Sequence, residues 1–291
     1  MSEIAQQGQE ETGSAEAQDG RASAQDSFIV FDGVSMRYST RQGSTLALSD
    51  INLTVGREEF VTLVGRSGCG KTTLLRILAG LIRPTEGEVS VGGRPLWHGG
   101  KRDDEALAML GLVFQDANLF PWYSVQENIA LPLRLRGVDK AKRRERALEL
   151  SELVGLGGFE EAYPRELSGG MRQRVAIARA LSYEPEILLM DEPFGALDAM
   201  TRDKMNVELQ RIAAATRATV VFVTHSITEA VFLADRVVLL SARPGRLRSV
   251  TPVHFERPRS NLDLQTDVEF QEIAKELRHQ LDADEDEEKS A

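Results

Sequence analysis

The stretch Gly65-Arg66-Ser67-Gly68-Cys69-Gly70-Lys71-Thr72-Thr73 decides the fold of this chain. It follows the apolar run 60–64 and leads into residues 74–79, whose apolar positions have helical spacing. A strand, a glycine-rich loop and a helix in this order form a phosphate cradle, because glycine lets several backbone N–H groups converge on one anion. The new helix adds the positive end of its dipole. The stretch therefore predicts that residues 65–73 bind a nucleoside triphosphate.

Two side chains of the loop have expected roles. Lys71 would reach the β- and γ-phosphates, and the Thr72 hydroxyl would ligate Mg²⁺. Cys69 stands at a helix N-terminus, where the pKa of a thiol tends to fall, although a small residue that simply fits the turn is the simpler interpretation. The loop alone does not distinguish a kinase, a GTPase, a motor or a pump, and a chance match in a glycine-rich turn is the plain alternative.

The net charge of −10 resides in the two ends of the chain. Residues 1–27 and 281–291 each contribute −5, so residues 28–280 are formally neutral. A nucleic-acid-binding body is usually basic, and we expect no nucleic-acid partner. The acidic ends are interpreted as aids to solubility.

A single cysteine excludes an intrachain disulfide and fits a reducing compartment. No apolar run approaches the ~20 residues that a membrane span needs. The first residues lack the basic and apolar regions of a signal peptide. We expect a soluble chain on the cytoplasmic side of the membrane.

The rest of the chain predicts an α/β fold with a P-loop NTPase core, in which a mixed sheet has mainly parallel buried strands. Alternating apolar runs between residues 28 and 55, joined by 87–93, predict an antiparallel β subdomain. Continuous apolar runs at 187–190, 219–223 and 236–240 predict parallel strands buried on both faces. The expected domains are a disordered acidic tail 1–26, a nucleotide-binding ATPase domain 27–250, a C-terminal extension 251–281 with an amphipathic helix, and an acidic tail 282–291.

A helical subdomain is expected at about 116–167, inserted between core strands. Ser124 and Glu127 form a capping-box pattern that opens a helix toward Leu135. Asp139 can cap a second helix. The C-terminal extension has the apolar stripe Ile273, Leu277 and Leu281, whose packing partner stays open.

Two acids follow the buried strand 187–190. Asp191 ends the strand, which places its carboxylate where Mg²⁺ would sit beside the phosphates. Glu192 follows and points differently, so it can orient and activate a water molecule as general base. Acids that merely end a strand at the solvent are the alternative.

The segment Leu167-Ser168-Gly169-Gly170-Met171-Arg172-Gln173-Arg174 distinguishes the class. Ser168 has the position of an N-cap, and the two glycines leave a helix end that an anion can approach closely. A chain that already has one phosphate cradle would then clasp a nucleotide between two surfaces.

Through these motifs, the chain resembles the ATP-binding-cassette (ABC) transporter ATPases over residues 28–250. Tyr38 matches the aromatic residue that stacks on adenine, residues 65–72 match the Walker A loop, and 167–171 match the signature LSGGM. Further matches are Gln115 of the Q-loop, Asp191 and Glu192 of Walker B, Asp198 of the D-loop and the switch histidine His225.

The resemblance implies a homodimer or paired cassette in which two ATP molecules lie between one chain's Walker A loop and the other's Ser168, Gly169 and Gly170. It implies ATP and Mg²⁺ as ligands, with Thr72, Gln115 and Asp191 around the metal. Glu192, His225 and Gln115 would then be catalytic, and Asp198 would link the two sites.

Residues 118–122, 191–198, 224–236 and 241–246 further resemble importer subunits of the nitrate/sulfonate/taurine type. The resemblance implies separate transmembrane permease subunits, an indirect link to a substrate-binding protein, and a peripheral place on the membrane. Phe120, Trp122 and Tyr123 follow the Q-loop and are expected to receive a cytoplasmic helix of the permease, or else to fill the core of the helical subdomain. The alternative functions are a cassette of another transporter class, a non-transport cassette ATPase and an unrelated P-loop kinase.

Overall fold

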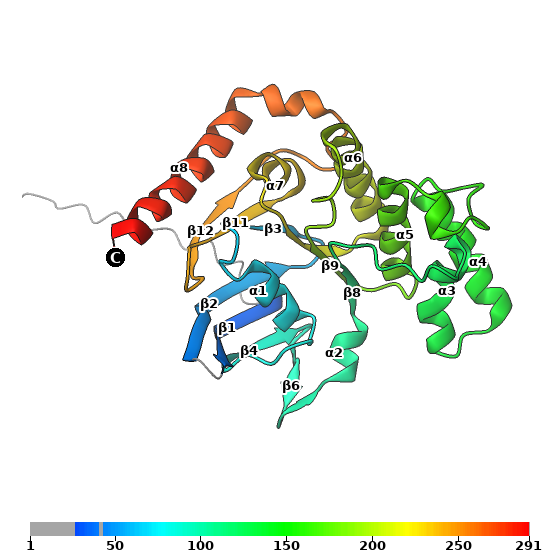
Figure 1. The fold of residues 1–291 in the computed structure, drawn as a ribbon, viewed down its shortest axis with the longest axis horizontal. Coiled ribbons are helices and arrows are strands. Elements are labelled where there is room, and N and C mark those ends of the chain that lie inside the picture. Colours follow the sequence, from blue (N-terminus) through cyan, green and yellow to red (C-terminus); the bar gives the residue numbers. More distant parts are fainter. Residues whose placement is uncertain (1–26, 41–42, 291) are drawn as a thin grey trace, which may run out of the picture.

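The structure is a computed structural model that describes residues 27–40 and 43–290, with side chains apart from those of Thr40 and 284–290. The predicted tail 1–26 lies outside the described residues. Figure 1 shows a central sheet with a smaller sheet on one side, a group of helices at one end and a long C-terminal helix along the outside.

The central sheet has the strand order β12-β11-β3-β10-β9-β8. All neighbours are parallel except the edge strand β12, which pairs antiparallel with β11. The strands are β3 (Phe60–Val64), β8 (Leu110–Val113), β9 (Ile187–Asp191), β10 (Thr219–Val223), β11 (Arg236–Leu240) and β12 (Leu247–Pro252). The predicted mixed sheet with mainly parallel buried strands is confirmed.

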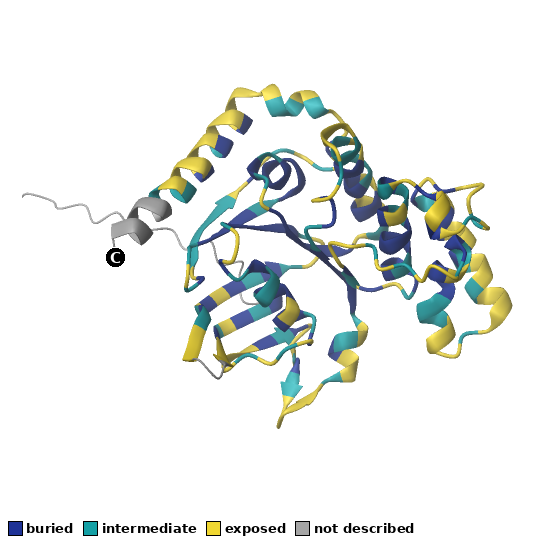
Figure 2. Ribbon diagram, in the orientation of Figure 1, coloured by how far each residue is buried: buried dark blue, intermediate teal, exposed yellow. Residues whose placement is uncertain are grey.

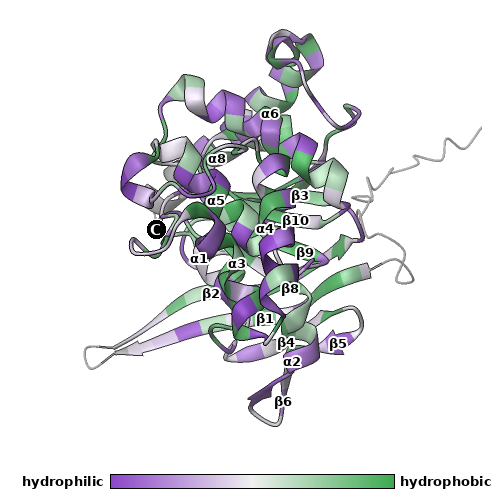
Figure 3. Ribbon diagram, turned by 90° about the vertical axis from the view of Figure 1, so that its right-hand side faces the viewer, coloured by the Kyte–Doolittle hydropathy of each residue, from purple (hydrophilic) through white to green (hydrophobic). Residues whose placement is uncertain are grey.

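The smaller sheet has the order β2-β1-β4-β5 and is antiparallel. It consists of β1 (Ser27–Thr40), β2 (Gly43–Gly56), β4 (Glu86–Val91) and β5 (Arg94–Pro95), and β6 (Trp97–His98) pairs with β7 (Lys101–Arg102) nearby. This confirms the antiparallel subdomain. In Figure 3 the ends of β1 and β2 extend beyond the body, while the hydrophobic residues gather at the central strands.

Alternate residues of the central strands face two separate cores, as the two-residue period of a strand requires. Phe60, Met190 and Phe222 belong to one core and Leu63, Leu189 and Val223 to the other. The first core is covered by helices and the second by α1 and the antiparallel sheet. Figure 2 shows these strands as the most continuously buried part of the ribbon.

Three of the helices begin where the sequence predicts caps. Ser124 and Glu127 form the capping box of α3 (Val125–Leu135), Asp139 caps α4 (Lys140–Leu153), and Ser168 caps α5 (Gly169–Leu181). The other helices are α1 (Lys71–Leu78), α2 (Asp104–Ala108), α6 (Ala199–Thr216), α7 (Ile227–Leu233), α8 (Val268–Ser290) and the 3₁₀ helices Pro164–Glu166 and Leu262–Thr266.

The C-terminal helix packs on its own chain. Phe270, Ala274 and Leu277 of α8 are buried in the first core, and Ile273 and Leu281 are partly buried against it. This answers the question of its packing partner. The helix runs on to Ser290, through the segment expected to be a tail.

None of the described helices is long and apolar enough to cross a membrane.

Candidate nucleotide-binding site

The glycine loop links β3 to α1 and has the backbone that only glycine adopts without strain. Gly68 and Gly70 have φ of 80° and 102°. A Cβ on Gly65 would come within 2.6 Å of the Cys69 Sγ and 2.8 Å of the Leu240 carbonyl oxygen. The loop is therefore folded tightly on the end of the sheet, with α1 beginning at Lys71.

Lys71 is held inside the loop. Its Nζ donates hydrogen bonds to the carbonyl oxygens of Gly65 (2.7 Å) and Arg66 (3.0 Å) and lies 3.9 Å from the Cys69 Sγ. Cys69 is buried, and this burial raises the pKa of its thiol more than the Lys71 charge lowers it. This direction is opposite to the tendency of a thiol at a helix N-terminus, because the Cys69 side chain is buried in the second core. The interpretation as a small residue that fits the turn agrees with this burial.

Thr72 and Asp191 meet across the site. The Thr72 hydroxyl donates to Asp191 Oδ1 at 2.9 Å, at the carboxyl end of β9. Burial raises the pKa of the Asp191 carboxyl, and the hydrogen bond from Thr72 offsets part of that effect. A hydroxyl and a carboxylate suit Mg²⁺, which takes oxygen ligands and leaves the remaining positions to phosphate and water. Among the described residues there is no group of three or more His, Cys, Asp and Glu that could hold a metal ion by itself.

Glu192 and His225 form the second polar pair. His225 Nδ1 lies 3.0 Å from Glu192 Oε2, and the imidazole is 57% exposed, against 25% for the Glu192 side chain. Glu192 has φ of 45°, an unusual backbone for a non-glycine residue, and its N–H is bonded to the Val223 carbonyl oxygen at the end of β10. This turn directs the carboxylate away from Asp191 and toward the histidine.

Lys71, Thr72 and Glu192 line one cavity of about 440 Å³, whereas Asp191 and His225 are not among its walls. Its walls come from the glycine loop, β1, β2 and the ends of the central strands: Tyr38, Thr45, Leu46, Ala47, Ser67, Gly68, Gly70, Lys71, Thr72, Thr73, Glu192 and Arg243. The Tyr38 hydroxyl lies 3.4 Å from the Thr73 hydroxyl, which places the aromatic ring at the rim. The structure thus brings Tyr38, the loop and Glu192 together.

Gln115 lies beside this cavity, in the loop after β8. A Cβ on Gly195 would be 3.7 Å from Gln115 Nε2 and 3.8 Å from Glu192 Oε2, so the two side chains flank the same glycine. The Gln115 amide therefore lies near the Glu192 carboxylate.

The signature segment and Asp198 lie apart from the cavity. Its walls include none of Ser168, Gly169, Gly170 and Asp198, although the structure describes all four. Ser168 is exposed, and its Oγ accepts from the Met171 N–H at 3.3 Å. Asp198 caps α6 by accepting from the N–H and hydroxyl of Thr201, which lowers the pKa of its carboxyl.

The glycines of the signature segment have a packing role as well. A Cβ on Gly169 would lie 3.2 Å from Leu197, and one on Gly170 would lie 3.0 Å from Thr201. The start of α5 therefore rests on the start of α6.

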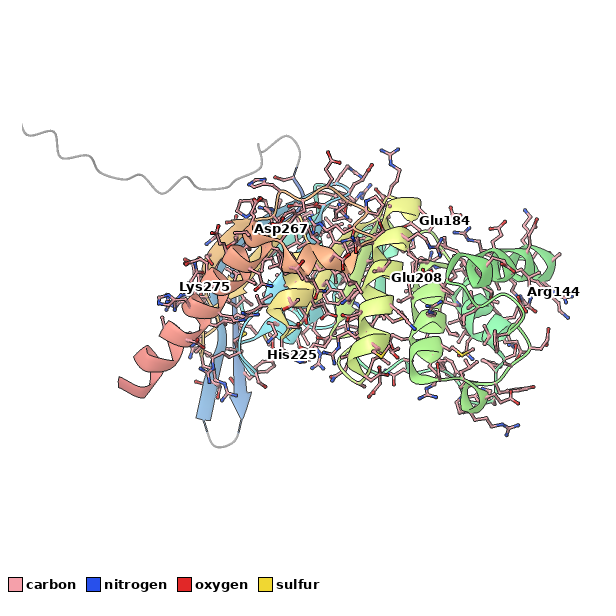
Figure 4. All side chains as sticks on the ribbon, turned by 90° about the horizontal axis from the view of Figure 1, so that it is seen from above. Arg144, Glu184, Glu208, His225, Asp267 and Lys275 are labelled. Carbon is pink, nitrogen blue, oxygen red and sulfur yellow. The ribbon has the colours of Figure 1, made fainter. Side chains whose placement is uncertain are left out.

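In Figure 4, seen from above, His225 lies between α8, marked by Lys275, and the outer end of the helical subdomain, marked by Arg144.

Sequence reasoning missed Arg243 and the β2 residues of the cavity. Arg243 stands just beyond the carboxyl end of β11, and the carboxyl ends of parallel strands are where ligands collect. That position is a signal that could have identified it.

Comparisons with known proteins find related sequences. The ABC transporter family matches residues 48–195. An uncharacterized ABC transporter ATP-binding protein of Methanocaldococcus jannaschii is 51% identical over 231 residues, which are 79% of this chain and 82% of that protein. The aliphatic sulfonates import ATP-binding protein SsuB of Bacillus cereus is 43% identical over 254 residues, which are 87% of this chain and 96% of that protein.

Solved structures resemble the fold as well. A dimeric post-hydrolysis state of the ATP-binding cassette MJ0796, bound to ADP and Pi, superposes with a TM-score of 0.68 at 35% identity and covers 78% of this chain and all of that one. The cbiO1 protein of Clostridium perfringens, part of the ABC transporter complex cbiONQ, superposes with a TM-score of 0.70 at 26% identity and covers 78% of this chain and 89% of that one. The chain thus belongs to the ABC transporter family and is one of its ATPases, in which hydrolysis of ATP is coupled to transport.

Proposed function

We propose that this chain is the ATP-hydrolysing subunit of an ABC importer for a small solute of the nitrate, sulfonate or taurine type. The observation that carries the hydrolytic part is the Glu192–His225 pair at 3.0 Å, beside the cavity that Lys71 and Thr72 line. The similarity to a sulfonate import protein supports the transport part.

In this proposal Glu192 is the general base. Its carboxylate accepts a proton from the attacking water, and His225 holds that carboxylate in place and faces the γ-phosphate. Lys71 exchanges its bonds to loop carbonyls for bonds to phosphate oxygens. Thr72, Asp191 and Gln115 would hold Mg²⁺, which neutralises charge that develops on the phosphates.

The hydrolytic role is tested with Glu192→Gln. We expect this variant to bind ATP but to release phosphate at least ~100-fold more slowly, the usual order for the loss of a general base. Glu272→Gln, an exposed residue of α8, is the matched control and should keep the wild-type rate. A Glu192→Gln variant with near-normal turnover would refute the role.

The composite site requires a second chain. Ser168, Gly169, Gly170 and Asp198 lie outside the cavity, so the proposal places them against the ATP of a partner copy in a head-to-tail dimer. ATP bound between the Walker A loop of one chain and the signature segment of the other would hold the dimer closed. Hydrolysis would remove the preference of the nucleotide for the closed dimer over the open one.

The aromatic cluster Phe120, Trp122 and Tyr123 is the proposed permease contact. The three rings lie 5.6–6.3 Å apart, and Trp122 is 65% exposed. An exposed aromatic cluster suits docking of a short helix better than a core role, and it follows the loop of Gln115 directly. This contact would keep the chain at the cytoplasmic face of the membrane, next to the permease and, through it, a substrate-binding protein.

The contact is tested by co-purification with the permease. Trp122→Ala should lose the permease from the complex and retain ATP binding, whereas Phe159→Ala, another exposed aromatic residue, should lose neither. Co-purification that survives Trp122→Ala would place the permease elsewhere. Growth of a deletion strain on single sulfur or nitrogen sources would identify the solute.

A further inference from the structure

The turn 241–246 between β11 and β12 rests directly on the glycine loop. The Gly245 N–H donates to the Ala47 carbonyl oxygen at 3.0 Å, and the Gly245 carbonyl oxygen accepts from the Ser49 N–H at 2.9 Å. A Cβ on Gly245 would lie 2.0 Å from the Cys69 carbonyl oxygen, a backbone atom that cannot move aside cheaply. The turn is therefore locked to both β2 and the loop.

This turn directs Arg243 to the cavity. Arg243 Nε donates to the Gly68 carbonyl oxygen at 3.2 Å, and a Cβ on Gly68 would lie 2.5 Å from Arg243 Nη2. The side chain is exposed and is one of the cavity walls, together with Ser67, Lys71 and Thr73. Its guanidinium thus lies over the middle of the loop.

The charge of Arg243 is uncompensated in the described part of the chain. It forms no ion pair with a carboxylate there, and its only side-chain hydrogen bond is the one through Nε. Other arginines at the ends of the sheet are paired, such as Arg236 with Glu59 and Arg257 with Asp235. The Nη groups of Arg243 consequently have free donors beside a loop built to receive phosphate.

We propose that Arg243 is a second phosphate-binding cation of the site, whose guanidinium binds the polyphosphate of the nucleotide from the exposed side. Lys71 serves the same anion from within the loop. A planar guanidinium suits two oxygens of a phosphate at once, and such charge-assisted bonds are among the strongest in proteins. The proposal rests on ATP occupying this cavity.

The test compares Arg243→Ala with Arg246→Ala. Arg246 lies on the same turn and is also exposed, but it is not part of the cavity, so it controls for general loss of positive charge. We expect Arg243→Ala to weaken binding of ATP and of ADP about 10-fold or more, measured by calorimetry, because it removes bonds between charged groups. Arg246→Ala should bind nucleotide like the wild type. Arg243→Lys keeps the positive charge but not the planar guanidinium, so its affinity should lie between those of Arg243→Ala and the wild type.

Steady-state kinetics give a second readout. If Arg243 holds the polyphosphate equally in the ground and transition states, its loss raises KM and leaves kcat near the wild-type value. If the ATP affinity of Arg243→Ala lay within two-fold of that of Arg246→Ala, the proposal for Arg243 would be overturned. The proposed function, ATP hydrolysis at this site, would be unaffected by that result. A wild-type chain that binds no ATP would overturn both this proposal and the proposed function.

Discussion

Glu192 owes its separate role to its backbone. With φ of 45°, the residue leaves the strand direction that Asp191 still follows. A backbone of this kind costs about 1–3 kcal/mol and persists only where the surroundings hold it, here through the bond to the Val223 carbonyl oxygen. Two consecutive acids thereby serve two partners, Thr72 and His225.

Glu229 is a buried acid next to this pair. Its Oε2 accepts from the Thr224 hydroxyl, while its Oε1 and the Asn206 Oδ1 have no hydrogen-bond partner among the described residues. Burial raises the pKa of the Glu229 carboxyl above its ordinary value of 4.5, more than Thr224 and the charges of Arg202 and His225 lower it.

We therefore predict that Glu229→Gln flattens the pH dependence of stability. An acid whose pKa is higher in the folded chain binds more protons there, so stability falls as the pH rises from 4.5 through the raised pKa. The amide cannot ionise, so the variant should lose less stability between about pH 5 and about pH 8 than the wild type. Urea midpoints at both pH values measure this, with Glu272→Gln as the control; equal losses in all three proteins would contradict it.

The burial of Cys69 predicts a thiol of low reactivity, whereas its position at a helix N-terminus in the sequence would predict a reactive one. The thiol is 1% exposed and its pKa is raised, so the thiolate that reacts is scarce and shielded. N-ethylmaleimide should modify the folded chain slowly with or without ATP, and rapidly once guanidinium unfolds it. Mass spectrometry follows the adduct. Rapid labelling of the folded chain that ATP prevents would contradict the burial.

At the scale of elements, helix α7 is clamped at the end opposite His225. Gln210 of α6 donates to the carbonyl oxygens of Phe232 and Leu233. The buried Arg259, from the C-terminal extension, donates through Nη1 to the carbonyl oxygens of Val231, Phe232 and Ala234 at 2.8–2.9 Å. These bonds satisfy carbonyl groups that every helix leaves unpaired at its C-terminus.

Arg259→Ala should consequently lower the free energy of unfolding by about 2–4 kcal/mol, because it leaves buried carbonyl groups without donors. Burial lowers the pKa of Arg259 to about 10, so the charged donor is still present at neutral pH. Urea unfolding measures the loss. Arg257→Ala, which removes a partly exposed ion pair with Asp235, is the control and should cost about 1 kcal/mol or less. Equal losses of unfolding free energy in the two variants would show that the bonds from Arg259 to the end of α7 stabilise the chain no more than the Arg257–Asp235 ion pair does.

The elements that the sequence predicted are those with local signals. Capping residues such as Ser124, Asp139 and Ser168 act within one turn of their own helix, so their positions are readable without the fold. The strand β8 was missed because its four residues include Gly111 and resemble a turn as much as a strand.

At the scale of the whole molecule, contacts that depend on the order of the strands in the sheet could not be predicted from the sequence. The contact between Arg243 and Gly68 exists because β11 lies beside β3, an arrangement that pairs residues 175 positions apart. The packing of α8 on α7 is likewise a non-local contact, made through Phe270 and Leu277 against the first core. The roles of Tyr38, Gln115 and His225 came from the family resemblance, since each of them alone fits an ordinary packing position.

The division of the site between two chains gives the last prediction. Ser168 is exposed and is not among the walls of its own chain's cavity, so one chain supplies only half of the groups that the proposed function needs. Specific ATPase activity should therefore rise with protein concentration and level off where light scattering reports a dimer, since a symmetric assembly forms by mass action. Ser168→Arg should bind nucleotide as a monomer, fail to dimerise with ATP and show low activity at every concentration. Arg172→Ala is the control. Arg172 lies one turn further along α5 and is bonded to the Leu167 carbonyl oxygen of its own chain, so this variant distinguishes damage to the start of the helix from loss of the contact between the two chains. Wild-type activity that stays constant through the monomer range would show that one chain hydrolyses ATP unaided, and the composite site would then be wrong.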